Sequence, residues 1–268
     1  MIDAGLDIGT TQTLIDHVRH AQDVRLKAYL LRNPHLIAAL EEAGDRGAHV
    51  EVRLCGDPVE PKPDAHLKER NQHTIDELRK HHVDAQPDDT TGPGALHVKV
   101  AKVDGRTFYD DRNWCTAADE TVIVDERAGD PRIAHTKRAA LAKEADLIRT
   151  APGREVFVST EALGPGPVAD AIEWRAARGD SVKLLYDPAE IVDGDALFAR
   201  LRSAGVEVRA CHQARKIAAA PGRAWLGSAN ASPGGATREE WGLVVHNGPF
   251  RLADKLLATL RNAWRAAA

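Results

Sequence analysis

Short apolar runs alternate with amphipathic segments along the first part of the chain. The apolar run over Val24–Leu31 predicts a strand, and a second β-rich run follows at His49–Leu54. Between them, His35–Gly47 carries apolar residues at helical spacing and ends in Arg-Gly, which predicts a helix with a glycine stop. The pattern therefore reads strand, helix, strand.

The second part of the chain repeats this pattern 132 residues later, as measured from Gly47 to Gly179. Its predicted strand, helix and strand are Val156–Thr160, Pro167–Gly179 and Ser181–Tyr186. A further pair of similar segments, Leu96–Asn113 and Gln213–Asn230, is 117 residues apart. Each half then offers a strand and a closing helix: Thr121–Val124 with Ile133–Ile148, and Gly242–Val245 with Pro249–Trp264. An internal duplication explains these matches.

Strands that alternate with helices indicate an α/β fold in which helices pack on the faces of a sheet. We therefore expect two repeated α/β halves, residues 1–150 and residues 151–268. The offset between the halves falls from 132 to 117 residues, so the first half contains an inserted segment, around residues 57–72. The Pro-, Gly- and charge-rich stretches 57–73 and 86–95 are predicted to be surface loops.

Composition narrows the class of protein. The chain has 268 residues, is 43% hydrophobic and carries a net charge of −4, which argues against a broad nucleic-acid-coating surface. No run approaches the ~18 apolar residues of a membrane span. The N-terminus shows no signal-peptide pattern. The three cysteines have no CxxC spacing, so no disulfide framework is expected. We predict a cytoplasmic protein.

One motif carries recognisable chemistry. His97 and Lys99 are separated by one residue, Asp104 with its following glycine comes next, and Asn113 follows nine residues after the aspartate. Alternate residues of a strand face the same side, so His97 and Lys99 should project together while Val98 points into the core. Imidazole can attack phosphorus, lysine can offset phosphate charge, and an amide can donate to a phosphate oxygen.

These residues resemble the HKD signature of the phospholipase D superfamily. The family's GSxN segment has a counterpart in Gly227-Ser228-Ala229-Asn230, and the resemblance extends over nearly the whole chain through the repeat. It implies a phospholipase D-like fold, with central mixed sheets flanked by helices. It also implies a phosphodiester hydrolase or transferase that needs no metal or other cofactor. In this family one motif histidine is the nucleophile, and a second motif protonates the leaving oxygen.

The resemblance assigns roles residue by residue. His97 would form a phosphohistidine, and the catalytic set would further include Lys99, Lys216, Asn113, Asn230 and the residue at position 214. Phosphate would be bound by Lys99, Lys216, Ser228 and Asn230. Asp119 or Glu120 would orient His97 through Nδ1, with Asp119 aligned to Glu240, while Asp104 is interpreted as a structural turn residue.

The second motif departs from the family pattern. Ala214 stands at the position of His97, Lys216 matches Lys99, and Pro221 matches Asp104. In the first repeat, Asp110-Asp111-Arg112-Asn113 replaces GSxN and keeps only the asparagine. Together the halves retain one motif histidine, two lysines and two asparagines.

Several explanations for Ala214 stay open. In the first explanation, Ala214 is an inactivating substitution of a catalytic histidine. In the second, His212 supplies the proton for the leaving oxygen, since it would lie one pleat away on the strand face of Lys216. Alternatively, the protein is catalytically inactive and binds a phosphorylated ligand. A weaker hypothesis makes Asp110 and Asp111 new acid–base groups, although a solvated turn is the simpler interpretation.

The expected partner is a phosphodiester: a nucleic acid, a phospholipid head group or a small diester. A nuclease and a phospholipase D-like hydrolase both fit the signature. A homodimer is a further expectation, because single-motif members of the family build their site across one.

Overall fold

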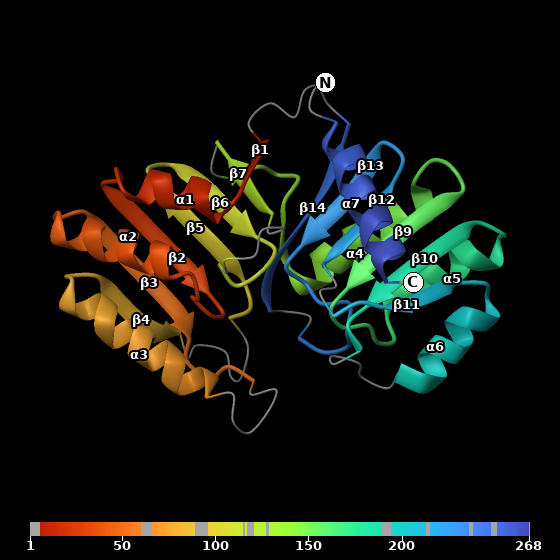
Figure 1. Cartoon of the computed structure of the whole chain (residues 1–268), viewed down its shortest axis with the longest axis horizontal. Helices are drawn as coiled ribbons and strands as arrows, with labels where there is room; N and C mark the ends of the chain where they lie inside the picture. Colours follow the sequence, from red (N-terminus) through yellow and green to blue (C-terminus); the bar gives the residue numbers. More distant parts are fainter. Residues whose placement is uncertain are drawn as a thin grey trace. The chain divides into compact units, whose positions relative to one another are not determined.

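The computed structural model describes residues 6–59, 66–88, 96–114, 116, 121–126, 129–188, 194–212, 215–235, 238–247 and 251–267. The chain forms two compact units, residues 5–130 and residues 131–268, called the first and the second unit below (Figure 1).

The first unit contains a seven-stranded mixed sheet in the order β1-β7-β6-β5-β2-β3-β4. Strands β2, β3 and β4 are parallel to one another, and the remaining pairs are antiparallel. Its elements are β1 (Leu6–Gly9), α1 (Thr11–Val18), β2 (Asp23–Ala28), α2 (Pro34–Asp45), β3 (His49–Cys55), α3 (Leu67–Lys80), β4 (Asp84–Asp88), β5 (Lys99–Val103), β6 (Arg106–Asp110) and β7 (Val122–Asp125).

The second unit contains another seven-stranded mixed sheet, in the order β11-β10-β9-β12-β13-β14-β8. Its elements are β8 (Ala134–Thr136), α4 (Lys137–Thr150), β9 (Glu155–Thr160), α5 (Pro167–Ala177), β10 (Ser181–Tyr186), α6 (Gly194–Ser203), β11 (Glu207–Ala210), β12 (Ile217–Ala220), β13 (Arg223–Gly227), β14 (Glu239–His246) and α7 (Leu252–Ala266). Matched by chain order, β8–β14 occupy the positions of β1–β7. The predicted pair of repeated α/β halves with mixed sheets is confirmed.

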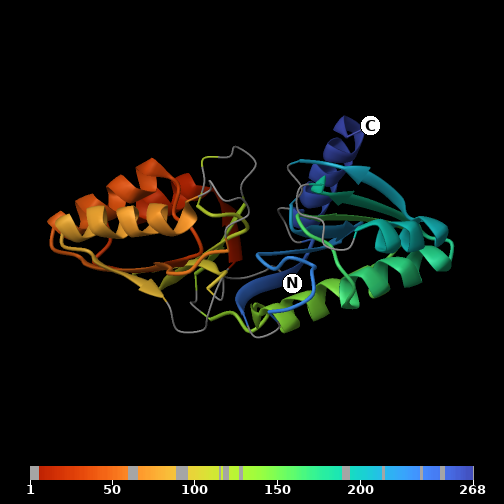
Figure 2. The same cartoon turned by 90° about the horizontal axis from the view of Figure 1, so that it is seen from below.

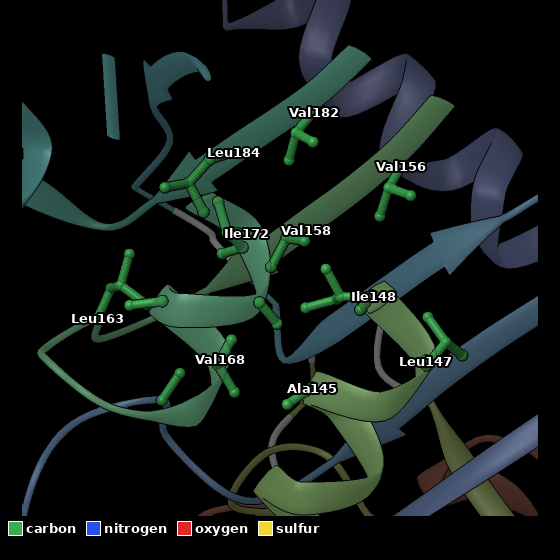
Figure 3. Packing of buried hydrophobic residues seen from close by; sticks show 14 of the residues in the cluster. Ala145, Leu147, Ile148, Val156, Val158, Leu163, Val168, Ile172, Val182 and Leu184 are labelled. Carbon is green, nitrogen blue, oxygen red and sulfur yellow. The ribbon is translucent and has the colours of Figure 1, made fainter. Parts of the chain in front are cut away.

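The second repeat begins earlier than the sequence suggested. Residues 134–136 form β8, which pairs with β14, although the apolar pattern predicted that a helix over 133–148 would close the first half. The α4 residues Ala145, Leu147 and Ile148 are buried in one apolar cluster with the β9 residues Val156 and Val158 (Figure 3). The pair β8–α4 therefore corresponds to β1–α1, and the units divide after residue 130 instead of after residue 150.

Helix α7 covers the sheet face opposite α4 in the second unit (Figure 2). Trp264 of α7 packs edge-on against Phe157 of β9, with ring centroids 6.3 Å apart. No described residue of the first unit forms a counterpart of α7. The position equivalent to Phe157 is Arg25, whose side chain is exposed, so this face of the first sheet is suited to water.

The inserted segment is more ordered than its composition predicted. Helix α3 begins at Leu67, inside the stretch predicted to be a loop, and residues 86–88 belong to β4. Leu67, Ile75 and Leu78 are buried on one side of α3, which supplies the packing that stabilises this otherwise polar helix. Asn71 of α3 donates hydrogen bonds to the carbonyls that follow β2 and end β3. No helix in the described part of the chain could cross a bilayer.

Glu144 gives the second unit a pH-dependent stability. Its side chain is 1% exposed on α4, and no described residue forms a hydrogen bond with Oε2. Burial raises the pKa of Glu144 from 4.5 to about 8. Because the folded-state pKa lies above the unfolded value, the free energy of unfolding falls as the pH rises from 4.5 to about 8.

We expect Glu144→Gln to raise the free energy of unfolding at pH 7 by roughly 3 kcal/mol and to flatten its pH dependence between pH 5 and 8. Urea unfolding at several pH values measures both effects. Glu207→Gln, which changes an exposed carboxylate on β11, serves as the control. Equal pH dependence in wild type and Glu144→Gln would contradict this prediction.

Candidate functional site

The motif residues His97, Lys99 and Asn113 of the first unit lie at one edge of its sheet. Lys99 begins β5 and pairs with Ala28 at the end of β2, and Val100 pairs with Tyr109 near the end of β6. The motif residues on β5 and the segment after β6 therefore lie together at the carboxyl ends of the parallel strands. This edge is where α/β sheets bind ligands.

His97 and Lys99 form a close pair at this edge. The Lys99 ammonium is buried, donates to the His97 carbonyl oxygen at 2.7 Å and lies 3.2 Å from the His97 Nδ1. The predicted same-side projection is confirmed, although the strand begins only at Lys99. Tyr29 completes the cluster: its ring centroid is 4.9 Å from that of His97 and 5.8 Å from the Lys99 Nζ. An aromatic face stabilises a nearby ammonium.

The His97–Lys99 contact bears on the tautomer of His97. With Lys99 donating to Nδ1, the proton of a neutral imidazole lies on Nε2. A carboxylate at Nδ1 would favour the opposite tautomer, with the Nε2 lone pair free to attack. Asp119 and Glu120, which were predicted for this role, lie outside the described residues.

The segment after β6 positions Asn113. The Asp110 carboxylate is buried and accepts a hydrogen bond from the Trp114 backbone N–H at 2.6 Å. Trp114 is fully buried with φ 45°, a left-handed conformation that is unfavourable for a bulky residue. The Asp110 bond and the burial of the indole hold this conformation and fix the direction of the preceding Asn113.

Asp111 takes the place of Ser228 in the backbone pattern. Its N–H donates to the Thr121 carbonyl, and its carboxylate accepts from the Thr121 N–H at 3.0 Å. Ser228 makes the same pair of bonds with the backbone of Trp241. Asp110 and Asp111 are thus buried and bonded to backbone amides, so the solvated-turn interpretation of this pair is wrong.

Glu240 is a buried partner of the GSxN segment. The Ser228 hydroxyl donates to the Glu240 Oε2 at 2.5 Å, and both side chains are buried. The Thr121 and Trp241 contacts set the repeat offset at 120 residues here. Glu120 therefore aligns with Glu240, which corrects the predicted alignment of Asp119 with Glu240.

The motif lysine of the second unit has a carboxylate partner. Lys216 directly precedes β12, is 3% exposed, and its Nζ lies 2.5 Å from the Glu161 Oε2. Ala214 lies outside the described residues. His212 is 83% exposed in a turn after β11, with its Nδ1 3.9 Å from Asp187, so it does not share a strand with Lys216 as predicted.

The motif asparagines of the two units share one feature of their side-chain amides. Asn113 and Asn230 each carry a buried Oδ1 without a hydrogen-bond partner among the described residues. Turning either amide by 180° exchanges its oxygen and nitrogen at little steric cost, which would direct an N–H group there.

Asp104 has a structural role. It lies in the left-handed turn between β5 and β6, and its carboxylate accepts from the backbone N–H groups of Gln22 and Asp23. These amides begin β2, whereas the sequence predicted amides of the turn itself.

A cavity of about 450 Å³ opens at the carboxyl end of β3 in the first unit. Its lining includes Cys55 and Gly56 after the strand and Lys68, Gln72 and His73 from α3. The described residues contain no cluster of three potential metal ligands.

Sequence reasoning missed Tyr29 and Glu161. Each residue directly follows the first parallel strand of its unit, β2 or β9, and the two are separated by the same 132 residues that relate the repeats. Extending the repeat alignment by one residue beyond these strands would have found both. The two side chains differ in chemistry, because Tyr29 is an aromatic ring and Glu161 is a carboxylate.

Comparison with solved structures identifies the fold. Over 98% of its length the chain resembles phosphatidylserine synthase from Haemophilus influenzae, with a TM-score of 0.64, 10% identity and 86% of that chain covered. Over 96% it resembles polyphosphate kinase from Porphyromonas gingivalis, with a TM-score of 0.62 and 15% identity; it spans half of that protein's length. A phospholipase D family member, Nuc from Salmonella typhimurium, matches half of the chain at 18% identity and a TM-score of 0.44.

No family model and no curated protein matches the sequence. The two near-full-length matches confirm the predicted phospholipase D-like fold.

Proposed function

We propose that the protein is a metal-independent phosphodiester hydrolase or transferase of the phospholipase D type, with His97 as the nucleophile. One observation carries this proposal: the buried Lys99 ammonium lies against His97 at the sheet edge that also presents Asn113. A nucleophile, a cation and an amide on one edge are the groups that phosphoryl transfer requires.

The reaction would proceed in two steps. In the first step, His97 attacks phosphorus through a ring nitrogen that carries no proton, the bond from phosphorus to the leaving oxygen breaks, and a covalent phosphohistidine forms. In the second step, water or an acceptor hydroxyl attacks the same phosphorus, the bond from phosphorus to His97 breaks, and the proton of the attacking oxygen passes to solvent. Lys99 and Asn113 stabilise the charge on the phosphoryl oxygens in both steps.

Ala214 affects how the leaving oxygen is protonated. Where a second histidine would protonate the leaving oxygen, alanine has no proton to give. The leaving oxygen then takes its proton from water, so the reaction favours leaving groups that are stable as anions. Activated aryl diesters are accordingly the first substrates to test.

A second candidate is a catalytically inactive protein that binds a phosphorylated ligand. The absence of a histidine at 214 and the ion pair of Lys216 with Glu161 favour it. Under either function the ligand is a nucleic acid, a phospholipid head group or a small diester. Binding that weakens steeply with salt would identify a nucleic acid.

Replacing Lys99 with methionine separates the two candidates. We expect Lys99→Met to lower kcat/KM for bis(p-nitrophenyl) phosphate by about 10²–10³-fold, because a preorganised cation is lost. Lys102→Met, on the exposed side of the same strand, should leave the rate unchanged. A Lys99→Met protein with full activity would exclude Lys99 from the reaction, and a wild type without activity would favour the ligand-binding protein.

A further inference from the structure

We propose that Glu161 controls the access of phosphate to Lys216: its carboxylate holds the ammonium until a phosphate group displaces it. This inference rests on the proposed function in one respect, because it takes Lys216 to be a phosphate-binding residue. It assigns to Glu161 a specificity-determining role at the second unit's half of the motif.

The two partners differ in how readily they can separate. The Lys216 side chain is 3% exposed, whereas that of Glu161 is 35% exposed. A buried ammonium without an anion is costly, so Lys216 must exchange one anion for another. The carboxylate can turn toward water at a smaller cost, which makes Glu161 the group that moves.

The position in the first unit that is equivalent to Glu161 carries a different kind of side chain. Tyr29 follows β2 as Glu161 follows β9, and it offers Lys99 a ring face at 5.8 Å in place of a carboxylate oxygen at 2.5 Å. A ring face attracts the ammonium but does not accept its N–H groups as an anionic oxygen does. Phosphate at Lys99 therefore meets no competitor from this position, whereas phosphate at Lys216 does.

This difference assigns separate tasks to the two motif lysines. Carboxylate and phosphate oxygens compete for the same three ammonium donors of Lys216. An inorganic phosphate or the phosphate group of a diester binds there only to the extent that it displaces Glu161. Lys99 would serve the covalent step, and Lys216 would serve reversible binding that the internal carboxylate keeps weak.

Binding of inorganic phosphate to the full chain tests the proposal by titration calorimetry. We expect Glu161→Gln to bind phosphate about fivefold more tightly than wild type, the scale of one partly exposed ion pair. Glu155→Gln is the matched control, because Glu155 begins the strand that Glu161 follows and pairs with Lys183 at 2.9 Å. This control should bind phosphate like the wild type.

Two more variants locate the effect. Adding Lys216→Met to Glu161→Gln should abolish the gain in phosphate affinity. If Glu161→Gln fails to fold, Glu161→Asp replaces it, and its shorter side chain should give an intermediate phosphate affinity. Equal or weaker phosphate binding by Glu161→Gln, or a gain that survives the loss of Lys216, would overturn the proposal. The titration needs no turnover and can be repeated in His97→Ala, so its failure is distinguishable from a failure of the proposed chemistry.

Discussion

His97→Ala is expected to lower the turnover of bis(p-nitrophenyl) phosphate by about a thousandfold or more, because the covalent route loses its nucleophile. The side chain contributes little to the core, since it is only half-buried and lies ahead of β5. Phosphate binding should survive, because Lys99 and Asn113 remain. Stopped assays at saturating substrate measure the loss in kcat directly.

His35→Ala is the matched control for this prediction. His35 is exposed near the start of α2 in the same unit, so its removal should change neither turnover nor stability appreciably. Retention of even a tenth of wild-type activity by His97→Ala would show that His97 is not the nucleophile.

Ala214→His is expected to have the second large effect, in the opposite direction. A histidine at 214 would restore the HxK pattern with Lys216 and supply a general acid for the leaving oxygen, which typically contributes about 10²–10⁴-fold. The gain should be larger for an alkyl diester than for a p-nitrophenyl diester, because the poorer leaving group depends more on the proton.

Ala214→Asn controls for the added polar side chain without adding a titratable group. If Ala214→His gains no turnover on either substrate, the interpretation of Ala214 as the lost partner of His97 is wrong. A gain in both variants would show that polarity at 214 matters and proton transfer does not.

The repeated strand–helix–strand pattern predicted most of the fold, because apolar spacing reports which face is buried. Strand β10 was predicted with the bounds that the structure shows. Strand β8 was missed because its three residues precede a longer helical pattern, and only its pairing with β14 defines it. Helix α3 was missed because prolines precede it and most of its residues are polar.

The motif predicted which residues would share an edge, but it could not predict their partners. The contact between His97 and Lys99 follows from alternation along the chain near β5. The pairing of Lys216 with Glu161 joins residues far apart in sequence, so only the antiparallel packing of β12 on β9 brings them together. The bonds of Asp110 and Asp111 to backbone amides likewise depend on the turn after β6.

A covalent intermediate at His97 is the most direct test of the proposed chemistry. With Ala214 in place of a second histidine, no motif histidine is available to activate the attacking water, so the intermediate should accumulate. After brief incubation with bis(p-nitrophenyl) phosphate, mass spectrometry should find one added p-nitrophenyl phosphoryl group on the peptide that contains His97. The adduct should be lost in acid, retained in alkali and absent from His97→Ala. Release of p-nitrophenolate without any adduct on His97 would contradict the account.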